Sequence, residues 1–115
     1  MNNLDNNNIK SIENVVPEQR DIHNAMRMIL LHDGTWVAER FYDQILQLIL
    51  DVAPALEVDR YYTAKKLCGN EFWNTLKKSQ RIKAGKCVVD MVRKNLLPLC
   101  FAGPTKANSQ QYKLK

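Results

Sequence analysis

The chain has 115 residues, 45% of them hydrophobic and 25% charged, with four glycines, four prolines and a formal net charge of +5. This length fits one domain with its own core, and the composition excludes a collagen-like, disulfide-dense or wholly disordered chain. No apolar run approaches the roughly 20 residues of a membrane span, and the N-terminus does not resemble a signal peptide, so we expect a cytoplasmic protein without membrane association.

The N-terminal region predicts an arm followed by a helix. Residues 1–16 are rich in asparagine and predict a disordered arm before a single domain over residues 17–115. Apolar residues at three- and four-residue intervals predict a helix over residues 17–32, ended by Gly34. A homodimer through the N-terminal helices is a further expectation, with a candidate seam at Met26, Met28 and Leu31, although these residues fit core positions equally well.

The next segment is the most apolar part of the chain. It predicts a helix over residues 35–51, capped by Thr35, that serves as the scaffold of the core. The residues expected on its buried face are Trp36, Val37, Phe41, Ile45, Leu48 and Ile49. Residues 56–62 alternate partly and fit either a short strand or an extended link.

Two short helices are expected in the middle of the chain. Thr63 is a suitable cap for a helix over residues 64–68, which Gly69 would end. Asn70 is a suitable cap for a second helix over residues 71–76. This second helix presents Phe72, Trp73 and Leu76.

A longer amphipathic helix is expected over residues 80–94, capped by Ser79. On a period of about 100° per residue, one arc of this helix is charged and is expected to face outward. The residues of that arc are Lys83, Lys86, Asp90, Arg93 and Lys94. The opposite, apolar side holds Ile82, Ala84, Val88, Val89, Met91 and Val92.

The C-terminus predicts an antiparallel β-hairpin. Residues 97–101 and 110–114 are the expected strands, and the turn-rich residues 102–109 form the loop between them. Pro98 is compatible only with an edge position, because it cannot donate a backbone hydrogen bond.

Charge is divided unevenly between the two halves of the chain. Residues 1–58 carry four basic and nine acidic side chains, whereas residues 59–115 carry thirteen basic and three acidic ones. Such a split predicts that the C-terminal half faces a polyanion. A solvated basic surface without a partner is the alternative interpretation.

The order of elements in the second half resembles the winged helix-turn-helix superfamily. The segment KCVVDMVRKNLLPLCF, residues 86–101, is similar to the end of a recognition helix that enters the first wing strand. The segment YTAKKLCG, residues 62–69, is similar to the shorter preceding helix. The resemblance covers residues 36–115 and departs at the extra apolar helix between Gly69 and Ser79. It implies a mostly α (α+β) fold, with a winged-helix-like helical domain, a C-terminal β-hairpin and additional N-terminal helices.

The resemblance implies a DNA-binding protein, either a transcriptional regulator or an accessory factor, that contacts duplex DNA through the long helix and the hairpin loop. Gln80 fits an adenine edge and Arg81 a guanine edge, although Arg81 equally fits a role in covering the apolar face with its stem. The residues expected to meet phosphates are Lys77, Lys78, Lys83, Lys86, Arg93 and Lys94, with Lys106 on the hairpin loop. Lys65 and Lys66 are weaker candidates.

Two other classes of function compete with DNA binding as interpretations of the sequence. A protein-interaction module, such as an adaptor, inhibitor or effector, could use the same basic face to dock an acidic protein partner. RNA binding is less favoured because the exposed aromatic pair expected on a sheet surface is missing.

Catalysis and metal binding have little support in the sequence. Cys68, Cys87 and Cys100 are widely spaced, whereas structural zinc ligands usually come in close pairs. His23 and His32 lie far from these thiols, and the chain has no Gly-rich phosphate loop. We therefore expect no enzymatic activity, no metal and no cofactor, and no small-molecule ligand is evident from the sequence.

Overall fold

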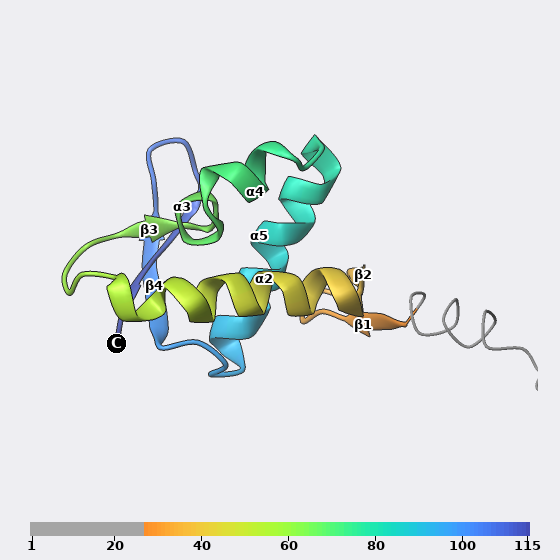
Figure 1. Ribbon diagram of the computed structural model, residues 1–115, viewed down its shortest axis with the longest axis horizontal. Helices are drawn as coiled ribbons and strands as arrows, with labels where there is room; N and C mark the ends of the chain where they lie inside the picture. Colours follow the sequence, from red (N-terminus) through yellow and green to blue (C-terminus); the bar gives the residue numbers. More distant parts are fainter. Residues whose placement is uncertain (1–26) are drawn as a thin grey trace, which may run out of the picture.

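The computed structural model describes residues 27–115, which form a mixed α+β domain (Figure 1). Of these residues, 48% are helical and 21% lie in strands, so the prediction of a mostly helical fold is wrong. The elements in chain order are β1 (Met28–Leu30), β2 (Trp36–Ala38), α2 (Glu39–Val52), the short 3-10 helix η1 (Ala53–Ala55), β3 (Tyr62–Thr63), α3 (Ala64–Cys68), α4 (Asn70–Asn74), α5 (Lys78–Arg93), β4 (Leu99–Pro104) and β5 (Gln110–Leu114).

Strands β1 and β2 form an antiparallel hairpin where the sequence predicted the end of one helix and the start of another. The turn explains the difference. The Asp33 carboxylate accepts a hydrogen bond from the Thr35 backbone N–H at 3.0 Å, and Gly34 has a φ of 89°. A pair of turn residues flanked by alternating apolar residues favours a hairpin over a helix. Residues 17–26 of the first predicted helix, and the predicted arm over residues 1–16, lie outside the described residues.

The β1–β2 hairpin also changes the predicted core and the predicted dimer seam. Trp36 was expected inside, but it is 56% exposed and lies opposite Leu30 on the outer face, whereas Val37 on the inner face is buried. Leu31, a predicted seam residue, is buried in the core of its own chain and is not accessible to a second subunit. Helix α2 therefore starts at Glu39, after Ala38, and not at Thr35.

The second sheet has three antiparallel strands in the order β3-β5-β4. The predicted C-terminal hairpin is confirmed, with a bulge between Phe101 and Gly103 that extends β4 to Pro104. Strand β4 lies at the edge of the sheet, directly after Pro98, as the missing donor of proline requires. The hairpin and the N-terminal end of α5 point to the same side of the molecule (Figure 1).

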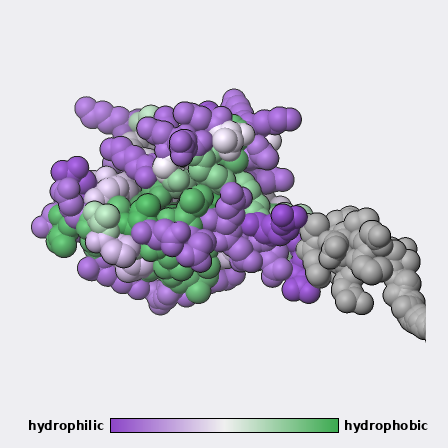
Figure 2. Space-filling view, viewed as in Figure 1, coloured by the Kyte–Doolittle hydropathy of each residue, from purple (hydrophilic) through white to green (hydrophobic). Residues whose placement is uncertain are grey.

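The core lies between α2, α5 and the second sheet. Ile45 and Ile49 of α2, Val88 and Met91 of α5, and Tyr112 of β5 are almost completely buried and belong to one cluster. Figure 2 shows that hydrophobic residues also gather on the surface over α2, with hydrophilic residues around them. The side chains of α2 that face solvent there include Leu50 and Val52.

The caps of the shorter helices were predicted in part. The Thr63 hydroxyl accepts a hydrogen bond from the Lys66 N–H and caps α3, as expected. Helix α4 begins at Asn70 itself and not after it, with Gly69 as its cap. Helix α5 begins at Lys78, so Ser79 is not its cap. Instead the Gln80 side chain accepts a hydrogen bond from the Lys77 N–H at 2.8 Å, which satisfies a donor at the helix start.

Candidate nucleic-acid interface

The burial of Asp90 shows which face of α5 is turned toward the core. This residue was predicted on the outer face, but it is only 2% exposed. Its carboxylate accepts hydrogen bonds from the Tyr42 hydroxyl at 2.8 Å and from the His32 backbone N–H at 2.9 Å. Lys94 Nζ lies 2.9 Å from the same carboxylate. Burial alone would raise the pKa of Asp90, but the contacts with Lys94, Tyr42 and His32 outweigh it and hold this pKa below its ordinary value.

The exposed face of α5 is consequently rotated from the predicted one. Lys78, Ile82, Val89 and Arg93 fall within about 60° of one another at 3.6 residues per turn. Ile82 was predicted to be buried, yet it is 53% exposed at the centre of this arc. The exposed face therefore carries cations near both ends and the exposed Ile82 between them, whereas Val89 is partly buried against the core.

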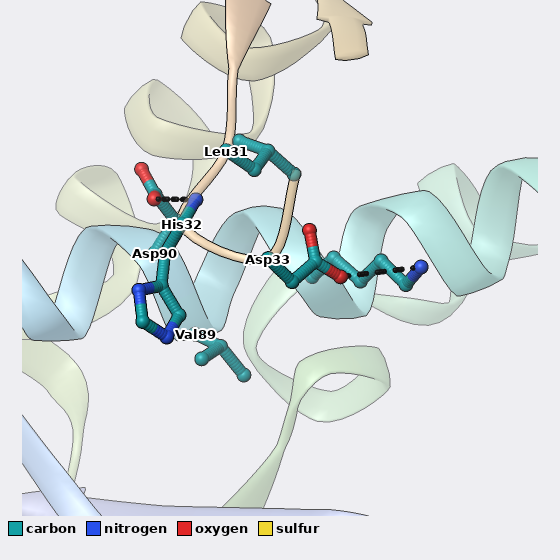
Figure 3. A pocket seen from close by; sticks show the side chains of 6 residues that line it. Leu31, His32, Asp33, Val89 and Asp90 are labelled. Atoms are coloured by element: carbon teal, nitrogen blue, oxygen red, sulfur yellow. Dashed lines mark hydrogen bonds and ion pairs between the residues drawn. The ribbon is translucent and has the colours of Figure 1, made fainter. Parts of the chain in front are cut away.

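Two of the predicted cations on α5 are already engaged within the protein. Lys86 Nζ lies 3.3 Å from the Asp33 carboxylate and donates a hydrogen bond to the Thr35 hydroxyl at 3.1 Å. These contacts join α5 to the β1–β2 turn, beside a hollow of ≈ 150 Å³ (Figure 3). Lys94 pairs with Asp90, and its ammonium group lies 5.8 Å from the centroid of the Tyr42 ring. Both lysines thus contribute to the fold.

The two predicted base-reading residues also have internal contacts. Arg81 is half-buried, and its Nε donates a hydrogen bond to the Trp73 carbonyl at 3.2 Å. This contact supports the role of Arg81 in covering the apolar surface, although its two terminal nitrogens stay free of any hydrogen bond within residues 27–115. Gln80 is exposed, but its side-chain oxygen caps the start of α5.

The remaining predicted residues are exposed cations on α5 and the hairpin loop. Within the described part of the chain, none of them forms an ion pair; they are Lys77, Lys78, Lys83, Arg93 and Lys106. The loop that carries Lys106 is held by hydrogen bonds between Thr105 and Ser109, including one from the Thr105 N–H to the Ser109 carbonyl at 2.7 Å. The position of Lys106 is therefore constrained.

Helix α5 and the C-terminal hairpin face each other across a cleft of ≈ 560 Å³. One wall is α5, from Arg81 to Val89, and the other includes residues 108–110 of the hairpin. Thr63, Ala64, Lys65 and Trp73 also line the cleft. Six of the lining residues were not predicted from the sequence to belong to a site: Trp73, Ile82, Gly85, Asn108, Ser109 and Gln110. A glycine inside an otherwise regular helix was the one available signal.

The comparisons with known proteins identify the family. Residues 48–113, more than half of the chain, match the model of a family described as Domain of unknown function (DUF1413). The chain belongs to this family. The match runs from within α2 to β5, so the DUF1413 region contains α5, the hairpin and the cleft but not the β1–β2 turn with Asp33. No curated protein and no solved structure matches this DUF1413 chain.

The part of the DUF1413 chain that the structure describes contains neither a cluster of metal ligands nor a reactive thiol in its core. Over residues 27–115, three or more His, Cys, Asp or Glu side chains do not come together as metal ligands. Burial raises the pKa of the Cys68 thiol to about 11 and that of Cys87 to about 12, so neither is a reactive thiolate near neutral pH. The helices of this part are too short or too polar to cross a membrane.

Proposed function

We propose that this protein binds duplex DNA through the exposed face of α5 and the loop of the C-terminal hairpin. The observation that carries the proposal is the placement of the exposed cations. Lys77, Lys78 and Lys83 lie at the start of α5, and Lys106 lies on the loop at the same side of the molecule. No carboxylate lines the cleft between them. A positive surface of this kind favours a polyanion.

The two kinds of exposed side chain on α5 have different roles in this proposal. The cations neutralise phosphates, which supplies affinity without sequence information. Ile82 in the middle of the face is 53% exposed and offers an apolar contact, of the kind that proteins make with the methyl group of thymine in the major groove. We therefore expect weak discrimination among sequences, with a preference for A·T pairs over G·C pairs.

The salt dependence of binding tests the proposal. If about six phosphates are contacted, the logarithm of the affinity should fall with the logarithm of the salt concentration with a slope of about −5. The triple variant Lys78→Ala, Lys83→Ala and Arg93→Ala should weaken binding to all sequences and make the slope less steep by about 3. Undetectable binding at low salt would refute the proposal.

A matched control variant distinguishes the effect of where the cations lie from the effect of a lower net charge. Arg27, Arg40 and Arg60 are exposed cations outside α5 and the hairpin, and their replacement by alanine changes the net charge by the same amount. We expect this control to keep the slope of the unaltered protein. An equal loss in both triple variants would place the DNA contacts elsewhere on the surface.

The second candidate function is docking of an acidic protein partner on the same face. Ile82 favours it, because an exposed apolar side chain among cations also suits a protein interface. The variant Ile82→Ser distinguishes the two. It should abolish binding to a protein partner, for which Ile82 is the central apolar anchor, and should reduce DNA affinity only modestly, because phosphate contacts dominate there.

The proposal includes a cytoplasmic location and a role as a transcriptional regulator or an accessory factor. All three cysteines are free thiols, and two of them are buried in the core. Unpaired cysteines are typical of a reducing compartment.

A further inference from the structure

The cleft between α5 and the hairpin has the size and lining of a ligand site in its own right. Its volume of ≈ 560 Å³ lies within the range of about 300–1,000 Å³ that is usual for small-molecule pockets. Lys65 and Arg81 bring two cations to its lining, which also includes Lys86, already paired with Asp33, and contains no acidic side chain. An anion is therefore the favoured occupant on electrostatic grounds.

The apolar residues of the lining indicate the chemistry of the rest of the ligand, apart from its anionic group. Trp73, Ile82 and Val89 line the cleft together with the buried Tyr112 of β5. Aromatic and aliphatic side chains of this kind bury flat apolar groups, and a few polar groups such as Asn108 then fix the orientation.

Gly85 gives an independent argument that the cleft is kept open. It lies in the middle of α5, where glycine costs roughly 1 kcal/mol relative to alanine. Its φ is not in the left-handed region, and a Cβ added there would meet no atom within 4 Å. Neither the backbone nor the packing of the protein therefore requires glycine at this position. What the missing side chain does provide is a flat wall that a ligand can approach closely.

We infer that the cleft binds a small anion with a flat apolar body, such as an aromatic carboxylate, an aromatic sulfonate or a nucleoside monophosphate. The anionic group would meet Lys65 and Arg81, whose terminal nitrogens form no hydrogen bond within residues 27–115. The flat body would lie against Gly85 and Trp73. This inference does not require DNA binding, and a protein that fails to bind DNA could still hold such a ligand.

The test uses anilinonaphthalene sulfonate as the probe and Trp73 as the reporter. The chain has two tryptophans, so Trp36→Phe leaves Trp73 as the only one. In this background the probe should bind saturably and quench the Trp73 fluorescence. N-Phenylnaphthylamine, which has the flat body without the charge, and inorganic phosphate, which has the charge without the body, should both bind at least about tenfold more weakly, since each forgoes one class of contact.

The variant Gly85→Leu provides the structural control. Its side chain should occupy the cleft and weaken probe binding at least about tenfold, while the melting temperature is kept or raised because leucine favours a helix. Ser79→Leu places the same side chain on an exposed, uncharged position of α5 outside the cleft and should bind the probe normally. The inference is overturned if Gly85→Leu binds the probe as tightly as the unaltered chain, or if the neutral analogue binds as well as the anion.

Discussion

Lys86 Nζ lies 3.3 Å from the carboxylate of Asp33, across the junction between α5 and the β1–β2 turn. This contact pairs a cation of the proposed DNA-binding helix with an acid from the N-terminal, acidic half of the chain. Hydrogen bonds from the Thr35 backbone N–H and hydroxyl, followed by the contact with Lys86, hold the pKa of Asp33 below its ordinary value. The acid thus remains ionised and competes with any phosphate for Lys86.

The first prediction follows from this competition. Asp33→Asn should raise the affinity for duplex DNA by about two- to fivefold at low salt, because Lys86 becomes available and a nearby negative charge is removed. The measurement is a fluorescence anisotropy titration. Asp43→Asn, an exposed acid on α2, removes the same charge elsewhere and should have a smaller effect. Equal gains from the two variants would show that only net charge matters.

The second prediction concerns Asp90 and stability. Asp90→Asn should lower the free energy of unfolding by about 2–4 kcal/mol at neutral pH, because the buried contacts with Tyr42 and Lys94 lose their charged acceptor. Urea unfolding measures this change. If the loss were no greater than that of Asp43→Asn, the buried position of Asp90 would be wrong.

The stability contributed by Asp90 should also depend on pH. Folding lowers its pKa, so this contribution is complete above the unfolded-state pKa of about 3.9 and is lost as the pH falls through the folded-state pKa. The difference in unfolding free energy between the unaltered protein and Asp90→Asn should therefore shrink in acid below about pH 4. A difference that stays constant down to pH 2 would contradict the account.

The sequence allowed some of these elements to be predicted and not others, for physical reasons. Thr63 caps the start of α3 and Gly69 caps its end, both through contacts within a few residues. Local chemistry is therefore sufficient to predict the limits of this helix. Asp90 was misplaced because its partners, Tyr42 and the His32 backbone, lie 48 and 58 residues away, and helical periodicity contains no information about such contacts.

The β1–β2 hairpin shows a different kind of error. The pair Asp33-Gly34 between short apolar segments is a strong hairpin signal. The apolar spacing before it also fits a helix, so the helical period and the turn chemistry favour different structures for the same residues. Of the nine predicted interface residues, those with no internal partner lie where the sequence suggested, whereas Lys86 and Lys94 were assigned to phosphates without knowledge of their acidic neighbours.

The third prediction compares two glycines with opposite roles. Gly69 has a φ of 91° and a ψ of 147°, a conformation almost restricted to glycine, so Gly69→Ala should destabilise the fold by about 1–3 kcal/mol. Gly85→Ala should stabilise it by roughly 0.5–1 kcal/mol, since the added Cβ favours the helix and meets no neighbour. Thermal unfolding of both variants is the check, and changes of the same sign would contradict the backbone geometry.

The most direct test of DNA binding by α5 and the hairpin is the map of amide chemical-shift changes when a short DNA duplex is added at low salt. The account predicts that the changes concentrate on residues 78–93 of α5 and on residues 105–109 of the hairpin loop, and that they disappear as salt is raised. Changes centred on α2 or on the β1–β2 hairpin, or no changes at all, would contradict it.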